Sequence, residues 1–243
     1  MAAAEMSDPQ ALAAFLDKWR ERWPEWSVAE VFIPADDRER AVAWFALLQE
    51  LTDAAWGGSD PRPGEAKLGW WAEELLGWQQ RRRRHPLGVA LQSAPAPWGR
   101  LGMALPVLLA AREAAVDREQ AIATISPLAE AAAAVGSVLF AGNCPEVAAQ
   151  PLLAQHLLLR GDAAAPLAVR ARLGEALSDH ALGRAWAGDL LASWPRMRAV
   201  PRPERVFAAL LRERLRRFSN GGGLGQPIPR MSSLWLSWRA ARG

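Results

Sequence analysis

Residues 36–55 read Asp-Asp-Arg-Glu-Arg-Ala-Val-Ala-Trp-Phe-Ala-Leu-Leu-Gln-Glu-Leu-Thr-Asp-Ala-Ala, and this stretch decides the fold class. Its large apolar residues recur at helical spacing, which is typical of one buried face of an α-helix. They are Val42, Phe45, Leu48 and Leu51. The pattern predicts a helix that opens at the two aspartates and runs to about residue 55.

The same period runs through most of the chain. Pro106 and Pro127 fall inside predicted helices and are expected to kink or split them. No segment keeps the two-residue period of a strand for more than a few residues, and no repeat of fixed length is found. We therefore expect a single all-α domain over residues 1–243, with a flexible loop at 219–229 before the last helix. The other helices are predicted from Asp8 to Trp23 and near 63–81, 98–115, 118–141, 145–160, 176–193, 203–218 and 230–241.

The composition is that of an ordinary globular protein. Of the 243 residues, 51% are hydrophobic and 23% are charged, which excludes wholesale disorder. A chain of this length buries a sizeable core without disulfides, and its single cysteine, Cys144, excludes an intrachain one. The 29 basic and 26 acidic residues nearly balance at +3, so no nucleic-acid partner is predicted.

The sequence shows no targeting segment. Residues 1–8 lack the basic start and the apolar run of a secretory signal. The longest unbroken apolar candidate, Ala131–Ala141, is shorter than the roughly 18 residues of a membrane span. The excess of Ala, Arg and Trp over Lys is typical of a GC-rich, bacterial coding sequence. We expect a cytoplasmic protein without a transmembrane segment, with peripheral membrane association as an alternative.

Four stretches, in register over roughly residues 28–240, resemble the squalene/phytoene synthase family. Residues 32–48 resemble its FLP and R-x-A-x-x-A-φ-x-A-F motifs, and residues 68–91 contain its L-x-x-W-x-x-E-L, H-P and A-L elements. Residues 133–139 are similar to its A-G-x-V-G-x-φ-φ helix. Residues 230–239 resemble its final helix and end in Ser-Trp-Arg.

The resemblance implies an isoprenoid synthase-like helical bundle around a central cavity. In that family, two facing acidic motifs hold Mg²⁺, which binds and ionises the diphosphate of an isoprenyl substrate. Mg²⁺ needs several hard oxygen ligands. The carboxylates must therefore repeat three or four residues apart on two helices that point into one cavity.

This chain departs from both acidic motifs. Where the family has DDxxD, residues 49–57 offer only Glu50 and Asp53. Where it has R-D-x-x-x-D, Asp162 stands alone after Gly161. These three residues are the candidate catalytic and Mg²⁺-binding groups if the chain is active. The alternatives are a solvated helix edge for Glu50 and Asp53, and a turn residue for Asp162.

The resemblance also implies how these groups are arranged. Glu50 and Asp53, three residues apart, should project from one face of their helix, and Asp162 should face them across the cavity. Arginines at the helix opening and beside Asp162 would hold an anionic head group by charge-assisted hydrogen bonds. The candidate substrate contacts are Arg38, Arg40, Gln155 and Arg160.

Two functions follow from the resemblance. In the first, the chain keeps the fold without metal-dependent catalysis, needs no cofactor, and binds a lipid, a prenyl compound or a protein partner. Its Ala-Leu-Leu-Gln-Glu-Leu and Ser-Trp-Arg stretches resemble those of squalene/phytoene synthase-like complex I assembly factors. In the second, it is an active Mg²⁺-dependent transferase that condenses two prenyl diphosphates. A helical interaction domain unrelated to the family is a third alternative.

Overall fold

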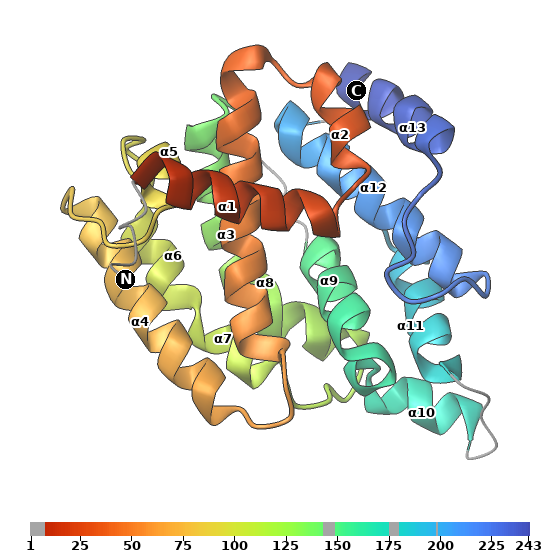
Figure 1. Ribbon diagram of the computed structural model, residues 1–243. Helices are drawn as coiled ribbons and strands as arrows, with labels where there is room; N and C mark the ends of the chain where they lie inside the picture. The colour runs from red at the N-terminus through yellow and green to blue at the C-terminus, as the bar shows by residue number, and fades with distance from the viewer. Residues whose placement is uncertain (1–7, 143–148, 175–179, 198) are drawn as a thin grey trace, which may run out of the picture.

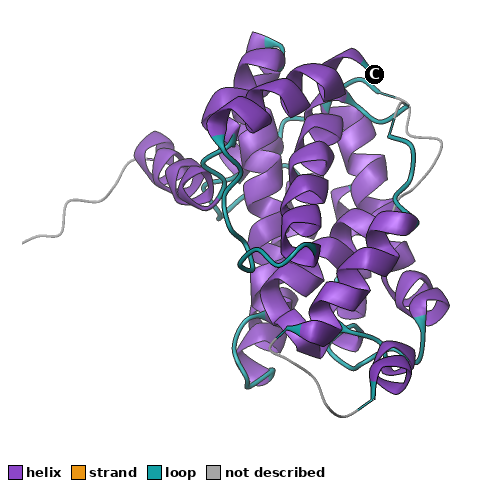
Figure 2. Ribbon diagram, turned by 90° about the vertical axis from the view of Figure 1, so that its right-hand side faces the viewer, coloured by secondary structure: helices purple, strands orange, loops and turns teal. Residues whose placement is uncertain are grey.

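The computed structural model describes residues 8–142, 149–174, 180–197 and 199–243. Within these ranges every regular element is a helix, and no strand is formed (Figure 2). The prediction of an all-α fold is confirmed. Cys144 and the predicted helix starts at 145 and 176 lie outside the described residues.

Short connections join the helices, several of which are only one or two turns long. The helix predicted at the two aspartates begins as a 3₁₀ turn and continues as an α-helix to Trp56. In chain order the elements are α1 (Asp8–Arg22), α2 (Trp26–Ala29), η1 (Glu30–Phe32), η2 (Ala35–Asp37), α3 (Arg38–Trp56), α4 (Arg62–Gln79), α5 (Gly88–Leu91), α6 (Trp98–Ala104), α7 (Pro106–Ala110), α8 (Arg118–Leu139), α9 (Gln150–Arg160), η3 (Gly161–Ala164), α10 (Leu167–Leu173), α11 (Ala181–Ala192), α12 (Arg202–Ser219) and α13 (Arg230–Arg242).

Helix α3 lies at the centre of the fold (Figure 1). It packs against α1, α4, α5, α7 and α9, and 13 of its 19 residues are buried. It is therefore a core helix rather than a surface helix with one apolar face. Trp44 and Leu47, which the predicted stripe leaves out, are as fully buried as Val42 because neighbouring helices cover α3 on several sides.

Helix α8 packs against α6, α7 and α9. It runs through Pro127 without a break, whereas Pro106 separates α6 from α7. By length and composition α8 could cross a membrane, with 22 residues and a mean hydropathy of 1.6. The expectation that no apolar segment is long enough is corrected here. Glu130 interrupts the apolar run in the sequence, but the helix continues through Glu130. In this fold 39% of its apolar window is buried, and Ile125 and Val135 are fully buried.

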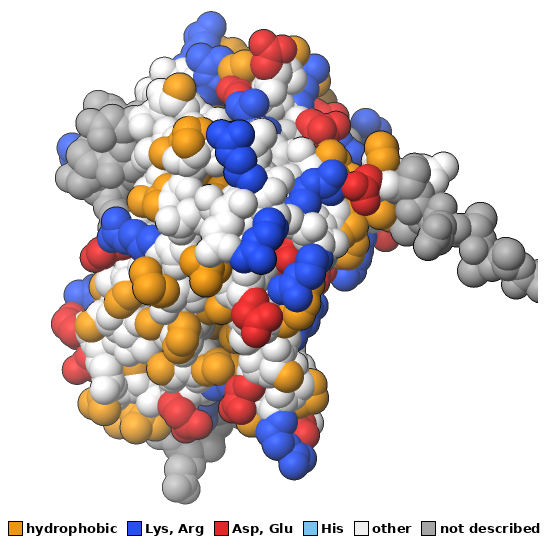
Figure 3. All heavy atoms as spheres, turned by 90° about the vertical axis from the view of Figure 1, so that its left-hand side faces the viewer, with side chains coloured by type: hydrophobic (Ala, Val, Ile, Leu, Met, Phe, Trp, Pro, Cys, Tyr) orange, Lys and Arg blue, Asp and Glu red, His pale blue; other side chains and the backbone are white. Residues whose placement is uncertain are grey.

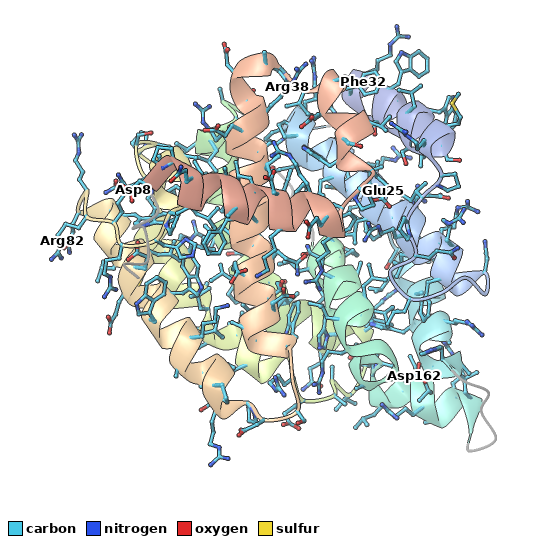
Figure 4. The ribbon with its side chains drawn as sticks, in the orientation of Figure 1. Asp8, Glu25, Phe32, Arg38, Arg82 and Asp162 are labelled. Atoms are coloured by element: carbon cyan, nitrogen blue, oxygen red, sulfur yellow. The ribbon has the colours of Figure 1, made fainter. Side chains whose placement is uncertain are left out.

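Four arginines, residues 81–84, follow the end of α4. Arg82 lies on the left-hand side in Figure 4, and several basic side chains cross that side of the molecule in Figure 3. Arg83 pairs with Asp8 of α1. Arg84 Nε lies 3.0 Å from Oε2 of Glu74, a buried carboxylate that also accepts the backbone N–H of His85. Arg83 therefore ties the end of α4 to α1, while Arg84 closes back on α4 itself.

Candidate functional site

An apolar pocket lies between α3, α8, α9 and α12, with a volume of about 100 Å³. Helix α8 contributes only alanines to its wall, and these small side chains leave the space open. Its polar side chains among the described residues are those of Gln155 and Glu204. The lining residues are Trp44, Phe45, Leu48, Ala129, Ala132, Ala133, Pro151, Leu152, Gln155, Met197, Val200, Glu204, Phe207 and Ala208.

Glu204 is the acidic group of this pocket. Its Oε1 accepts a hydrogen bond from Trp44 Nε1 at 3.3 Å. The residue keeps some accessible surface, but apolar side chains surround its carboxyl group. This burial raises the pKa of Glu204 to about 7, although the hydrogen bond from Trp44 acts in the opposite direction. Glu204 is therefore poised to gain or lose a proton near neutral pH.

Gly136 of α8 makes room for this carboxylate. A Cβ atom at residue 136 would lie 1.9 Å from Glu204 Oε1 and 2.7 Å from its Cδ. Neither distance is compatible with van der Waals contact, so the Glu204 carboxylate can occupy this position only because residue 136 is glycine. Gly136 belongs to the 133–139 stretch of the family resemblance, and the structure gives it a local role.

The pocket offers apolar walls and two polar groups to a ligand segment small enough for its volume of about 100 Å³. A protonated Glu204 donates a hydrogen bond and an ionised one accepts, while the amide of Gln155 does both. Small-molecule sites commonly combine such apolar walls with one or two polar groups that orient the ligand. None of the described lining residues is a lysine or arginine, so the pocket offers no cationic partner for a diphosphate.

Glu50 lies on another face of α3, between α1 and α4. Its Oε1 accepts a hydrogen bond from Lys18 Nζ at 2.9 Å, and its Oε2 accepts one from Lys67 Nζ at 2.7 Å. Burial raises the pKa of Glu50, but the hydrogen bonds and charges of Lys67 and Lys18 outweigh it, and the net pKa lies below the usual value. Glu50 is thus an ionised carboxylate held by two ammonium groups.

Asp53 shares that face with Glu50, as their spacing predicts, and both line a small crevice beneath α1. Asp53 Oδ2 lies 2.7 Å from Arg22 Nη1, and its Oδ1 accepts a hydrogen bond from Gln49 Nε2 at 2.7 Å. Asp53 and Trp44 are nine residues apart, which is roughly two and a half turns. Their side chains therefore leave α3 on opposite sides, and Asp53 points away from the apolar pocket.

The groups around Glu50 and Asp53 do not fit Mg²⁺. This ion requires near-octahedral oxygen coordination, but all four carboxylate oxygens here already accept hydrogen bonds, three from cations and one from an amide. In the part of the chain that the structure describes, no group of three or more His, Cys, Asp or Glu side chains is placed to hold a metal ion. We therefore derive no catalytic step through a metal.

Asp162 lies in η3, toward the α10 end of the molecule (Figure 4). Its Oδ1 accepts the backbone N–H of Gly183 at 2.8 Å, in the first turn of α11. This is the bond of a helix N-cap, made here by a side chain from another segment. Arg170 also donates to the backbone carbonyl of Asp162 at 2.9 Å. These contacts place Asp162 at the start of α11, whereas Glu50 and Asp53 face α1 and α4.

The predicted substrate contacts separate in the structure. Arg38 Nε donates to the carbonyl of Ile33 at 3.1 Å, and Arg40 Nη1 donates to the carbonyl of Leu139 at the end of α8, also at 3.1 Å. Arg160 ends α9, and its Nε is buried without a hydrogen-bond partner among the described residues. Of the four, Gln155 lines the apolar pocket.

Sequence reasoning missed Glu204, which shares an apolar stripe with Phe207, Ala208 and Leu211, at i, i+3, i+4 and i+7 on α12. This spacing is the signal that could have found it. This spacing is easily overlooked, because an acidic residue in the first turn of a helix is ordinarily explained by its favourable interaction with the helix dipole.

Comparison of the chain with protein-family models, with curated proteins and with solved structures finds no match. The resemblance to the squalene/phytoene synthase family therefore rests on the sequence motifs alone.

Proposed function

We propose that this chain is a cytoplasmic protein that binds the apolar chain of a lipid or prenyl compound in the pocket between α3, α8, α9 and α12, without metal-dependent catalysis. This is the non-catalytic function implied by its resemblance to squalene/phytoene synthases, with an isoprenoid synthase-like arrangement of helices. The observation that carries the proposal is the geometry of α3. Trp44 faces the pocket, while Asp53 points to the opposite side and is neutralised by Arg22.

The pocket favours a ligand with an uncharged polar end. A prenyl alcohol would place its chain against the apolar wall and its hydroxyl against Glu204 or Gln155. A prenyl diphosphate would bring several negative charges beside the Glu204 carboxyl group, with no cation among the described lining residues to compensate. We therefore expect farnesol to bind more tightly than farnesyl diphosphate.

A pair of alanines on α8 provides the test. Ala133 lines the pocket, and its neighbour Ala134 does not. Titration with farnesol, followed by calorimetry, should show that Ala133→Leu weakens binding by on the order of tenfold, because the added carbons fill the ligand's space. Ala134→Leu, the matched control, should leave the affinity unchanged. Binding that Ala133→Leu does not weaken would contradict the proposal.

The alternative function is an active Mg²⁺-dependent prenyltransferase. Incubation with Mg²⁺ and farnesyl or geranylgeranyl diphosphate, followed by measurement of released diphosphate, separates the two. We expect no release above background. Release that disappears in the double variant Glu50→Gln, Asp53→Asn would establish the enzyme and overturn the non-catalytic proposal.

A further inference from the structure

Helix α13 carries most of its large apolar side chains on its outer side, whereas Leu236 packs against the core. At the outer edge of the fold, no described element covers that side of the helix (Figure 1). The inner side holds Ser233 and Ser237, both fully buried. This polarity is the reverse of the ordinary surface helix, which turns its apolar stripe to the core. The exposed residues, spaced three and four apart, are Met231 (76% exposed), Leu234 (38%), Trp235 (53%) and Trp238 (40%).

The inner contacts hold α13 in place without these large side chains. Helix α13 packs on α12 and α2, and its small inner residues allow a close approach. On this inner side, Leu236, Ala240 and Ala241 pack against the core. Arg205 of α12 donates to the carbonyls of Ala240 and Ala241 near the end of α13. The outer tryptophans are therefore available for a contact outside the chain.

Positive charge surrounds this apolar face. The guanidinium of Arg239 lies 4.9 Å from the Trp235 ring centroid, and that of Arg242 lies 4.2 Å from the Trp238 centroid. Helix α13 itself carries three arginines, Arg230, Arg239 and Arg242, and no aspartate or glutamate. The groove between α11, α12 and α13 is lined by Arg196, Arg205, Arg212, Arg216 and Arg239, and Glu213 is the one acidic side chain among its described lining residues.

We propose that the outer face of α13 binds the surface of an anionic phospholipid bilayer, with the helix lying in the plane of the interface. Trp side chains favour the headgroup level of a bilayer because the indole is apolar with one polar N–H. Arginines beside them meet lipid phosphates, and an apolar face flanked by cations is the pattern of interfacial helices. Pairing with a second copy would set the same arginines against one another, which is unfavourable.

Vesicle co-sedimentation tests this surface directly. The wild-type chain should sediment with vesicles of phosphatidylcholine and phosphatidylglycerol in equal parts, and much less with phosphatidylcholine alone. The double variant Trp235→Ala, Trp238→Ala should lower the partition coefficient by on the order of tenfold or more. The double variant Arg239→Ala, Arg242→Ala should lower binding to the anionic vesicles by roughly fivefold per arginine at low salt. Added salt should weaken wild-type binding.

Two controls keep the result decisive. Met103→Ala removes a side chain that is 78% exposed on α6, away from α13, and should bind vesicles like the wild type. Thermal unfolding should show that the α13 variants remain folded. The proposal would be overturned if the wild-type protein did not bind anionic vesicles, or if the Trp variants bound them as tightly as wild type. So would a wild-type dimer that the Trp variants convert to monomer, since the face would then be a protein interface. The outcome does not depend on farnesol binding.

Discussion

Glu25 and Arg214 form a buried bidentate ion pair, although 189 residues separate them in the chain. Arg214 Nη2 lies 2.6 Å from Glu25 Oε2, and Nε lies 2.9 Å from Oε1. The backbone N–H of Ile228 donates to the same Oε1 at 2.8 Å, and the guanidinium lies 3.8 Å from the centroid of the Trp23 ring. This pair joins the turn between α1 and α2 to α12 and to the segment that leads into α13 (Figure 4).

Replacing Glu25 by Gln should destabilise the fold strongly. It would leave Arg214, whose side chain is 5% exposed, as an uncompensated buried charge, at a cost of about 3 kcal/mol in the free energy of unfolding. Urea denaturation measures the loss. The control is Glu213→Gln, whose partner Arg216 is 56% exposed and which should cost less than about 1 kcal/mol. Equal losses in the two variants would contradict the prediction.

The titration of Glu204 should appear in the pH dependence of stability. Its pKa is raised to about 7 from an ordinary 4.5, so the folded state binds the proton more tightly than the unfolded chain. The stability that this proton contributes is present below the unfolded pKa and is lost as pH rises toward 7, amounting to about 3 kcal/mol. Glu204→Gln removes the effect. Its unfolding free energy relative to wild type should therefore increase from about pH 5 to about pH 8.

Comparing Glu204→Gln with wild type separates the pH dependence that Glu204 contributes from the pH dependence that the histidines contribute. Burial lowers the pKa of His85 to about 4 and that of His156 to about 3. Both residues therefore remove stability as pH falls below 6.5, but they do so equally in the two proteins. If the difference in unfolding free energy between Glu204→Gln and wild type stays constant with pH, Glu204 has an ordinary pKa and the prediction is wrong.

Gly136→Ala should disturb the contact between α8 and Glu204. The new Cβ would displace the flexible Glu204 carboxylate from its position against Trp44. The lost hydrogen bond costs about 1 kcal/mol, which helix propensity offsets in part, and farnesol binding should weaken. Gly69→Ala is the control, because residue 69 is an exposed glycine inside α4 with open space where its Cβ would lie. That substitution should stabilise the protein by about 0.5–1 kcal/mol through helix propensity. Thermal unfolding measures the stability of both variants and calorimetry measures their farnesol binding. A Gly136→Ala variant that binds farnesol as tightly as wild type would contradict the prediction.

Asp162 should behave as a cap and not as a metal ligand. Asp162→Ala removes the acceptor for the Gly183 N–H and should cost about 1 kcal/mol. Asp162→Asn keeps an acceptor oxygen and should cost less. Hydrogen exchange at the Gly183 amide should accelerate in the alanine variant only. Addition of Mg²⁺ should stabilise none of these proteins, and a Mg²⁺-dependent stabilisation of wild type that both variants lose would contradict the capping role.

The periodicity of the sequence was enough to predict the all-α fold, because helical spacing is a local property. It also put Glu50 and Asp53 on one face of α3, since residues three apart on a helix always share one. Composition correctly pointed to an ordinary buried core. Val42 and Leu51 of α3, predicted to be buried from their spacing alone, are buried in the structure.

The tertiary structure alone decided what each face meets. Spacing does not reveal that Lys18 and Lys67 come from different helices to hold Glu50, or that Arg22 reaches Asp53. The local sequence around Glu204 gives it a place in the first turn of a helix, and only the packing of α8 against α12 turns it into a pocket residue with a raised pKa. The physical reason is that a helical period fixes which side chains lie together on one element. Burial, charge pairing and pKa depend on contacts between elements far apart in the chain, and those contacts are set when all the helices pack at once.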